Sequence, residues 1–322
     1  MMVSHPRSIL VITGPTGIGK TDLAMRLADD SPLRIISADS VMVYRHLDIG
    51  SAKPSASELE RYPHDLIDLV EPEYPFDVGQ YLLHAKRSIQ HAWQRNEVPC
   101  LVGGTILYLK SLLDGLDPLP KADPEIRKRI REKAEQQGWP AIHDWLKGLD
   151  PGAAEIIHPN HSSRLERALE VRLKTGESIR SFWTEGPSEF MIGDQRADLD
   201  VLALIPADRE KLKERLNRRF DSMLDRGFVD EVQSLRTRSG LTKACPSMRS
   251  VGYRQIWQYL DREISETEMR EKAQAATRQL AKRQLTWLRS WRADTNTLIK
   301  VSDSLPIAEG KTWLSKVFDR VL

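Results

Sequence analysis

The chain has 322 residues, with 48 lysines and arginines against 46 aspartates and glutamates, so its formal net charge at pH 7 is +2. The contents of hydrophobic residues (40%) and charged residues (29%) are ordinary for a soluble globular protein. No apolar run approaches the roughly 18 residues that a membrane span needs, and no cleavage site of a signal peptide follows the first apolar run. Two cysteines, Cys100 and Cys245, are too few for a disulfide framework or a zinc site. We therefore expect a cytoplasmic protein without membrane association, and we expect a monomer.

The first apolar run, SILVIT at 8–13, has the composition of a buried strand. It is followed by GPTGIGKT at 14–21, which matches the pattern G-x-x-x-x-G-K-[ST], and then by helical apolar spacing over 21–30. Such a loop surrounds phosphate oxygens with backbone N–H groups at the N-terminus of a helix, while its lysine reaches the outer phosphates. The predicted phosphate-binding residues are Gly14, Pro15, Thr16, Gly17, Ile18, Gly19, Lys20 and Thr21, and the Thr21 hydroxyl is the predicted Mg²⁺ ligand.

Further strands are predicted at 34–38, 98–103 and 201–205. They alternate with helical patterns such as 77–95 and 104–114. This alternation is typical of a parallel sheet covered by helices. The expected fold class is therefore α/β, with a P-loop-type parallel sheet as its core.

A helical pattern interrupts this alternation between the third and fourth predicted strands. The segment 123–138 combines an Asp cap, a proline at the first helical position and a glycine after the end. The segment 162–176 has serine caps, an apolar stripe and a glycine stop. We therefore expect three parts: the first part of the core over 1–116, a helical insertion over 117–199, and the completion of the core with a basic helical part over 200–322.

The positive charge is concentrated near the C-terminal end. Residues 209–292 hold 20 lysines and arginines against 11 acidic residues, a balance of +9, while the rest of the chain has a balance of −7. Within 270–292, seven basic residues are interleaved with Trp287 and Trp291. These charges are either solvated helix faces or a binding surface for a polyanion.

ATP-hydrolysing P-loop proteins usually have a second strand that ends in an aspartate holding Mg²⁺. Here the strand at 98–103 is followed by Gly104 and Thr105, whereas Asp39 and Ser40 follow the strand at 34–38. The carboxyl ends of parallel strands share one edge of a sheet, so Asp39 is expected beside the P-loop, where it can act on a second substrate. The alternative is that Asp39 and Ser40 only cap a turn, and a P-loop kinase also remains open.

Seven segments carry most of the remaining information: GPTGIGKT (14–21), DSVMVYRHLDIGSAKP (39–54), PHDLIDLVEP (63–72), GGTILYLKSLLDG (103–115), RALEV (167–171), VGYRQ (251–255) and TRQLAKRQLTWLR (277–289). Together, and in this order, they resemble the bacterial tRNA dimethylallyltransferases, also called isopentenyl-diphosphate:tRNA transferases. The resemblance extends from about residue 9 to residue 292. The chain departs from the family pattern at four positions. The family often has Gln where this chain has Met42, and it commonly has Thr, His and Tyr in place of Ser51, Asp65 and Leu280. None of these differences removes a charged group.

The resemblance implies transfer of a dimethylallyl group from dimethylallyl diphosphate to the N6 amine of the adenosine just 3′ of the anticodon in tRNA, with release of diphosphate. It implies that Asp39 is the general base, that Thr105 is its hydrogen-bonding neighbour and that Arg219 contacts the diphosphate. The residues implied to contact the tRNA anticodon stem-loop are Asp39, Ser40, Val41, Met42, Arg127, Ser163, Arg164, Leu165, Glu166, Arg167, Arg249, Ser250, Val251, Gly252, Tyr253, Arg254, Lys282 and Arg283.

The chemistry of this reaction suits the residues present. The adenine amine becomes acidic as its new bond to carbon forms, so a nearby carboxylate can take the proton. The P-loop would stabilise the negative charge that develops on a departing diphosphate. Two alternatives stay open, a dimethylallyltransferase that acts on free AMP and a small-molecule kinase.

Overall fold

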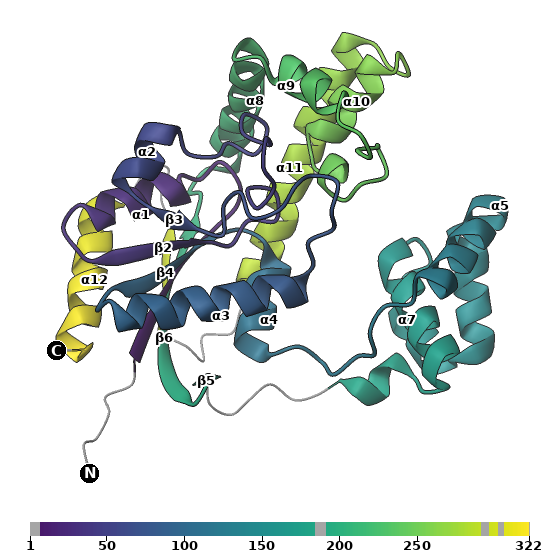
Figure 1. The fold of residues 1–322 in the computed structure, drawn as a ribbon, viewed down its shortest axis with the longest axis horizontal. Helices are drawn as coiled ribbons and strands as arrows, with labels where there is room; N and C mark the ends of the chain where they lie inside the picture. Colours follow the sequence, from purple (N-terminus) through teal and green to yellow (C-terminus); the bar gives the residue numbers. More distant parts are fainter. Residues whose placement is uncertain (1–6, 184–190, 291–295, 302–305, 322) are drawn as a thin grey trace. The chain divides into compact units, whose positions relative to one another are not determined.

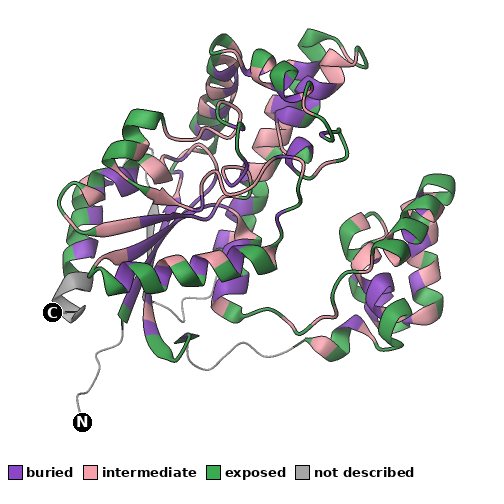
Figure 2. Ribbon diagram, viewed as in Figure 1, coloured by how far each residue is buried: buried purple, intermediate pink, exposed green. Residues whose placement is uncertain are grey.

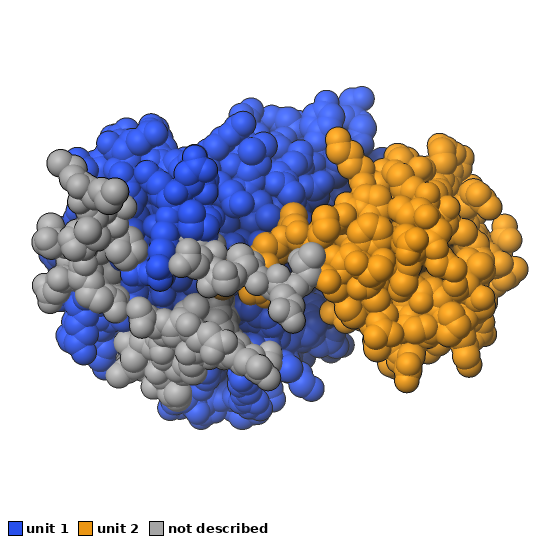
Figure 3. Space-filling view, turned by 90° about the horizontal axis from the view of Figure 1, so that it is seen from below, with its two compact units in different colours: residues 1–112, 188–322 blue, residues 113–187 orange. Residues whose placement is uncertain are grey.

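The computed structural model describes residues 7–183, 191–290, 296–301 and 306–321 (Figure 1). The chain forms two compact units (Figure 3). The core unit consists of Met1–Leu112 together with Ser188–Leu322, and the helical unit consists of Leu113–Pro187. Among the seven basic residues counted near the C-terminal end, Arg292 lies outside the described residues, as does Trp291.

The core unit is built on a mostly parallel sheet, which confirms the expected α/β class. Its described strands are β1 (Arg7–Thr13), β2 (Leu33–Ser37), β3 (His64–Asp65), β4 (Val98–Gly103), β5 (Met191–Ile192), β6 (Gln195–Ile205) and β7 (Asn296–Val301). The parallel strands follow the order β3-β2-β4-β1-β6-β7, and β5 pairs with β6 in the antiparallel direction. The predicted strands at 8–13, 34–38 and 98–103 correspond to β1, β2 and β4.

Helices follow most of the strands. The described α-helices of the core unit are α1 (Lys20–Ala28), α2 (Ala56–Arg61), α3 (Val78–Gln94), α4 (Ile106–Asp114, at the boundary between the units), α8 (Arg209–Asp225), α9 (Phe228–Leu235), α10 (Tyr253–Leu260), α11 (Glu266–Ser290) and α12 (Ile307–Val321). None of the helices among the described residues is both long enough and apolar enough to cross a membrane.

The continuous apolar run of β1 explains why both faces of the sheet are covered, because successive side chains of the run point to opposite faces and all of them are buried (Figure 2). Leu10 and Ile12 are fully buried in a cluster that includes side chains of α1 and α12. Ile9 and Val11 are also fully buried and point to the opposite face. There Trp93 of α3 donates a hydrogen bond to a backbone carbonyl of β1 over 3.3 Å.

The carboxyl ends of the three central strands lie at one edge of the sheet. The register pairs Thr13 at the end of β1 with Gly103 at the end of β4, and Ser37 at the end of β2 with Val102. The P-loop, Asp39 and Thr105 each follow one of these strand ends, so the topology gathers them at this edge.

The helical unit contains α5 (Pro124–Leu149), α6 (Pro151–Ile156) and α7 (Ser162–Thr175), which enclose their own apolar cluster. In α5 the backbone leaves helical angles at Gly138 (φ 79°, ψ 162°), which is the predicted end of the first helix. A second helical run then continues to Leu149. The expected serine cap of α7 was wrong, because His161 occupies the N-cap position and its side chain makes no capping hydrogen bond.

The boundaries of the helical unit also differ from the expected range of 117–199. The chain returns to the core unit at Ser188, and β6 begins at Gln195, before the predicted strand at 201–205. The first half of β6 carries polar residues between its buried ones, including the buried Asp200. The apolar run that predicts a strand therefore begins only in its second half.

Candidate active site

The P-loop connects β1 to α1 and depends on glycines at two positions. Gly19 is the N-cap of α1 with a left-handed φ of 99°. Gly17 has a φ of 74°, and a Cβ atom there would lie only 2.6 Å from the Cδ2 atom of Leu216 on α8. The side chain of Ile18 is buried in the core and 6% exposed, so only its backbone can face a ligand. The loop is thus held between the sheet and α8.

Lys20 is the charged side chain that the P-loop offers. Its Nζ atom donates a hydrogen bond to the carbonyl oxygen of Pro15 over 2.9 Å. Burial lowers the pKa of Lys20 to about 8, with the negative charge of Asp39 opposing that shift and the positive charge of Arg219 adding to it. Burial also lowers the pKa of the Arg219 guanidinium, against the attraction of Asp39 and Asp22. These charges therefore interact directly across the site.

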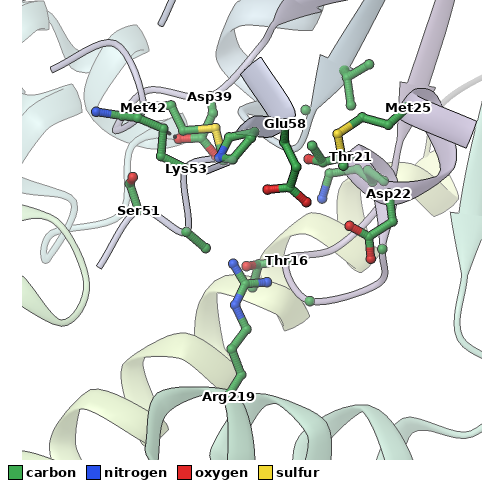
Figure 4. A pocket seen from close by; sticks show the side chains of 17 residues that line it. Thr16, Thr21, Asp22, Met25, Asp39, Met42, Ser51, Lys53, Glu58 and Arg219 are labelled. Carbon is green, nitrogen blue, oxygen red and sulfur yellow. Dashed lines mark hydrogen bonds between the residues drawn. The ribbon is translucent and has the colours of Figure 1, made fainter. Parts of the chain in front are cut away.

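A polar cavity of about 340 Å³ opens beside the P-loop. Figure 4 shows Arg219 extending from α8 toward Thr16, with the carboxylate of Glu58 pointing into the same space. The cavity is lined by Thr16, Gly17, Gly19, Lys20, Thr21, Asp22, Met25, Asp39, Met42, Ser51, Ala52, Lys53, Pro54, Glu58, Val102, Gly103 and Arg219. Such a mixture of backbone N–H groups, three cationic side chains and oxygen atoms suits a phosphorylated ligand.

Asp39 caps a turn and also faces this cavity. Its Oδ1 atom accepts hydrogen bonds from the backbone N–H groups of Val41 (2.8 Å) and Met42 (3.3 Å). Among the described residues, no hydrogen bond ends on its second carboxylate oxygen, Oδ2. The turn-capping alternative and the catalytic role are therefore compatible, since each uses a different oxygen.

Thr105 lies against the turn that carries Asp39. Its Oγ1 atom accepts a hydrogen bond from the Ser40 N–H over 3.0 Å, and its own N–H donates to the carbonyl oxygen of Ala38 over 3.2 Å. Its hydroxyl also donates to the Ser40 hydroxyl over 3.4 Å. Thr105 thus touches both neighbours of Asp39 in the sequence, and these contacts fit a residue that positions Asp39.

A smaller, mainly apolar cavity of about 120 Å³ adjoins the polar one. The two share Thr16, Asp39, Ser51 and Arg219 as wall residues. The walls of the second cavity are completed by Val41, Gly50, Leu216, Phe220, Met223, Phe228, Val251, Gly252, Thr277 and Leu280. The site therefore has a phosphate-binding half and an apolar half, which meet at Asp39 and Arg219.

The loop at 48–51, which lines both cavities, is held by Glu231 of α9. The Glu231 carboxylate accepts backbone hydrogen bonds from Asp48 (3.0 Å), Ile49 (2.6 Å) and Gly50 (3.3 Å), and a fourth from the Tyr253 hydroxyl (2.6 Å). Gly50 permits this close approach, because a Cβ atom there would lie 2.1 Å from the Phe228 ring. Sequence reasoning missed Glu231, since nothing local to α9 indicates a partner so far away in the chain.

The polar cavity offers oxygen atoms of the kind that bind a magnesium ion. Thr21, Asp22, Asp39 and Glu58 present oxygen atoms, the ligands that Mg²⁺ prefers. Within the described ranges, no three His, Cys, Asp or Glu side chains are arranged to hold a metal by themselves. Mg²⁺ is commonly held by one or two side chains together with substrate phosphates, and Thr21 is in position to be one of these.

The stretches of the core unit implied to contact tRNA divide into exposed and buried residues. Arg249, Arg254, Lys282 and Arg283 are exposed and available to an RNA backbone. Tyr253 is fully buried and hydrogen-bonded to Glu231, so its role is structural. Val251 and Gly252 line the apolar cavity, as do Asp39 and Val41, whereas Met42 lines the polar one and Ser40 is exposed.

The corresponding residues of the helical unit mostly hold that unit together. The fully buried carboxylate of Glu170 accepts hydrogen bonds from Arg127 (2.8 and 2.9 Å), from Arg167 and from the Asp123 N–H (2.6 Å). Although burial raises the pKa of Glu170, these hydrogen bonds outweigh it and hold the pKa below the ordinary range.

The other helical-unit residues implied to contact tRNA differ in exposure. Glu166 is bound by Arg131 over 2.6 and 2.9 Å, and Leu165 is fully buried in the apolar cluster. Ser163 and Arg164 are exposed. An RNA contact by the Leu165 side chain is therefore excluded by its burial, while Ser163 and Arg164 present accessible surface.

Comparison with known proteins places the chain among tRNA-modifying enzymes. Residues 42–291 match the IPP transferase family, and residues 7–68 match the isopentenyl transferase family. The chain is 48% identical over 295 residues to tRNA dimethylallyltransferase 2 of Hahella chejuensis, with 89% of each chain covered. It is 46% identical over 290 residues to the tRNA dimethylallyltransferase of Cupriavidus taiwanensis, again with 89% of each chain covered.

Solved structures agree with these matches. The full-length tRNA isopentenylpyrophosphate transferase of Bacillus halodurans superposes with a TM-score of 0.69 at 31% identity, covering 98% of this chain and 97% of that one. A eukaryotic dimethylallyltransferase captured while acting on tRNA superposes with a TM-score of 0.74 at 25% identity, covering 97% of this chain and 77% of that one.

Proposed function

The chain belongs to the IPP transferase family, and from this membership we propose that it prenylates tRNA, transferring a dimethylallyl group from dimethylallyl diphosphate to the N6 amine of the adenosine 3′ of the anticodon. The observation that carries the proposal is the pair of adjoining cavities. Dimethylallyl diphosphate has the same two halves, a charged diphosphate and a short apolar chain. The polar cavity suits the first and the apolar cavity suits the second.

In the proposed reaction the bond between C1 of the allyl group and the diphosphate oxygen breaks, and a bond between C1 and N6 forms. The diphosphate leaves with the electron pair of the broken bond, so negative charge grows on its oxygens. Lys20, Arg219 and the P-loop N–H groups line the polar cavity and would stabilise that charge. Thr21 would help to hold a Mg²⁺ ion, which would supply further neutralisation. No water has to be activated, which agrees with the lack of an aspartate at the end of β4.

The amine must also lose one proton. We assign this proton to Oδ2 of Asp39, at the boundary of the two cavities, while Oδ1 keeps the turn in place. Thr105 and the backbone around it orient the turn through Ser40 and Ala38.

The adenosine must first leave the stack of the anticodon loop to reach this boundary. Exposed arginines and lysines at Arg249, Arg254, Lys282 and Arg283 on the core unit, and Arg164 on the helical unit, are suited to hold the RNA backbone. A transferase acting on free AMP would use the same cavities but would not require these exposed cations.

The substitution Asp39→Asn tests the proposal, because the asparagine Oδ1 can still accept both turn hydrogen bonds while the proton acceptor is lost. The loss of a general base typically slows a reaction by about 10²–10⁴-fold. We expect that loss in the single-turnover rate with saturating dimethylallyl diphosphate and tRNA, with donor affinity nearly unchanged. Asp77→Asn is the matched control, since Asp77 caps α3 in the same way through Gln80.

Three outcomes of this experiment are distinct. Near-normal turnover of the Asn variant would mean that Asp39 only caps the turn. A parallel loss of donor affinity would identify Asp39 as a ligand of the Mg²⁺–diphosphate instead of the base. Transfer of the dimethylallyl group to free AMP but not to tRNA would show that AMP is the acceptor and would refute the proposed tRNA substrate.

A further inference from the structure

Gln284 of α11 is a buried polar residue, and only 6% of it is exposed. Its side-chain Oε1 atom accepts a hydrogen bond from the backbone N–H of Thr16 over 2.8 Å. Its Nε2 atom donates a hydrogen bond to the carbonyl oxygen of Gly104, also over 2.8 Å. One amide group therefore joins the P-loop to the segment between β4 and α4.

The junction is tightly packed. A Cβ atom at Gly104 would lie 2.5 Å from the Nε2 atom of Gln284 and 3.0 Å from the carbonyl oxygen of Gly14. Glycine at 104 thus allows the P-loop, the end of β4 and the Gln284 amide to meet at one point. The amide cannot shift by much without losing one of its two partners.

The segment beyond Gly104 leads directly to Asp39. Thr105 is the next residue, and it is bonded to Ala38 and Ser40 on either side of Asp39. Hydrogen bonds therefore link Thr16 in the P-loop to Gln284 and Gln284 to Gly104, and the peptide bond from Gly104 leads to Thr105. Thr105 is in turn hydrogen-bonded to the turn that carries Asp39. The P-loop and this turn follow different strands, and the side chain of Gln284 links them.

We propose that Gln284 is a positioning residue that fixes the P-loop relative to the turn carrying Asp39. This inference rests on the proposed function, in which the diphosphate lies in the P-loop and Asp39 removes the proton of the amine. The reacting carbon is attached to the diphosphate and the amine is held near Asp39, so the separation of the two segments sets the distance over which the new bond forms. Misplacement by about 1 Å can cost about 10²-fold in rate.

The residue type fits this role. Thr16 offers a donor and Gly104 offers an acceptor, so the linking group must accept at one end and donate at the other. A primary amide does both, an ionised carboxylate only accepts, and lysine or arginine only donates. Asparagine has the same amide but is shorter by one methylene group.

Two variants test the proposal. Gln284→Met keeps an unbranched side chain of similar length but removes both hydrogen bonds. Gln284→Glu keeps the acceptor for Thr16 but places a carboxylate oxygen against the Gly104 carbonyl. Gln94→Met, at the exposed C-terminal end of α3, is the matched control for the first variant.

The measurements are the single-turnover rate of tRNA prenylation at saturating donor, the dissociation constants of dimethylallyl diphosphate and tRNA, and the unfolding temperature. All rates are taken well below the unfolding transition of each variant. We expect Gln284→Met and Gln284→Glu to be slower than the wild type by about 10- to 100-fold, with both dissociation constants changed by less than about threefold. We expect Gln94→Met to match the wild type.

Other results overturn the proposal. If both variants fold and their rates lie within threefold of the wild-type rate, Gln284 does not position the site. Its role is then only to pair the buried N–H group of Thr16 and the carbonyl group of Gly104. If the affinity for dimethylallyl diphosphate falls as much as the rate does, Gln284 supports only the diphosphate-binding conformation of the P-loop. If Gln284→Met does not fold, a near-normal rate for Gln284→Glu that stays unchanged as the pH is raised contradicts the proposal. A buried carboxyl can keep the Gly104 contact only while it is protonated, so a rate that does not depend on pH would show that this contact is dispensable. A wild-type enzyme that cannot use dimethylallyl diphosphate would instead refute the proposed function.

Discussion

The loop at 48–51 should depend on Glu231, and the structure allows the size of that dependence to be estimated. In Glu231→Ala, three backbone N–H groups and the Tyr253 hydroxyl lose a charged acceptor. Hydrogen bonds to charged groups contribute about 1.5–3 kcal/mol each, so four of them contribute about 6 kcal/mol at the lower end. Asp48 is exposed and Ile49, Gly50 and Glu231 are partly exposed, so water can replace about half of that contribution. We therefore expect a loss of about 3–4 kcal/mol in the free energy of unfolding.

Glu231→Gln should cost much less, for a geometric reason. The amide oxygen can take the place of Oε2 and keep the bonds from Asp48 and Ile49. The amide NH₂ group then faces the Tyr253 hydroxyl, which can rotate to accept, and only the long bond from Gly50 is lost. With the charge also removed, we expect a loss of about 1–2 kcal/mol.

Urea denaturation followed by circular dichroism measures both values, and the exposed Glu210→Gln on α8 serves as the control. The tRNA prenylation rate of Glu231→Ala should also fall, because Gly50 and Ser51 form cavity walls. Equal and small losses for the Ala and Gln variants, below about 0.5 kcal/mol, would show that the loop is held by its packing alone.

Three further predictions follow from the site and the helical unit. Lys20→Ala should slow prenylation by about 10²–10³-fold, through the loss of charge stabilisation on the departing diphosphate, and a single-turnover rate near the wild-type value would contradict this. Glu170→Ala should reduce stability by about 3 kcal/mol, since it leaves two partly exposed arginines without their buried partner, and urea denaturation of the full chain measures the loss. Replacing residues 113–187 with a short linker should abolish tRNA binding but leave the binding of dimethylallyl diphosphate measurable. The binding of tRNA to the wild type should weaken steeply as the salt concentration rises. A truncated protein that still binds tRNA normally would show that the helical unit takes no part in tRNA recognition.

Sequence reasoning succeeded where the signal is local. The P-loop follows from glycine and lysine spacing between a strand and a helix, and β4 was predicted with its observed bounds because its apolar run is bounded by clear breaks. The proximity of Asp39 to the P-loop follows from a topological rule, because both lie at the carboxyl ends of parallel strands.

The predictions failed or fell short where contacts between residues far apart in the sequence determine the structure. Gln284 lies 268 residues from its partner Thr16, and nothing in the composition of α11 distinguishes it from an exposed glutamine. Leu165 lies in a stretch that the resemblance associates with tRNA, but the apolar stripe of α7 buries it. The start of β6 was missed because polar residues alternate with its buried ones.

The central claim is that the P-loop holds a diphosphate that departs without hydrolysis of ATP. The most direct measurement incubates the enzyme with tRNA, Mg²⁺ and dimethylallyl diphosphate labelled in its allyl group, with and without ATP, and then quantifies labelled adenosine and released diphosphate. We predict that label appears at N6 of the adenosine 3′ of the anticodon, with one diphosphate released for each group transferred, at the same rate whether or not ATP is present. Transfer that requires ATP, or ATP consumed in proportion to tRNA modification, would contradict the account.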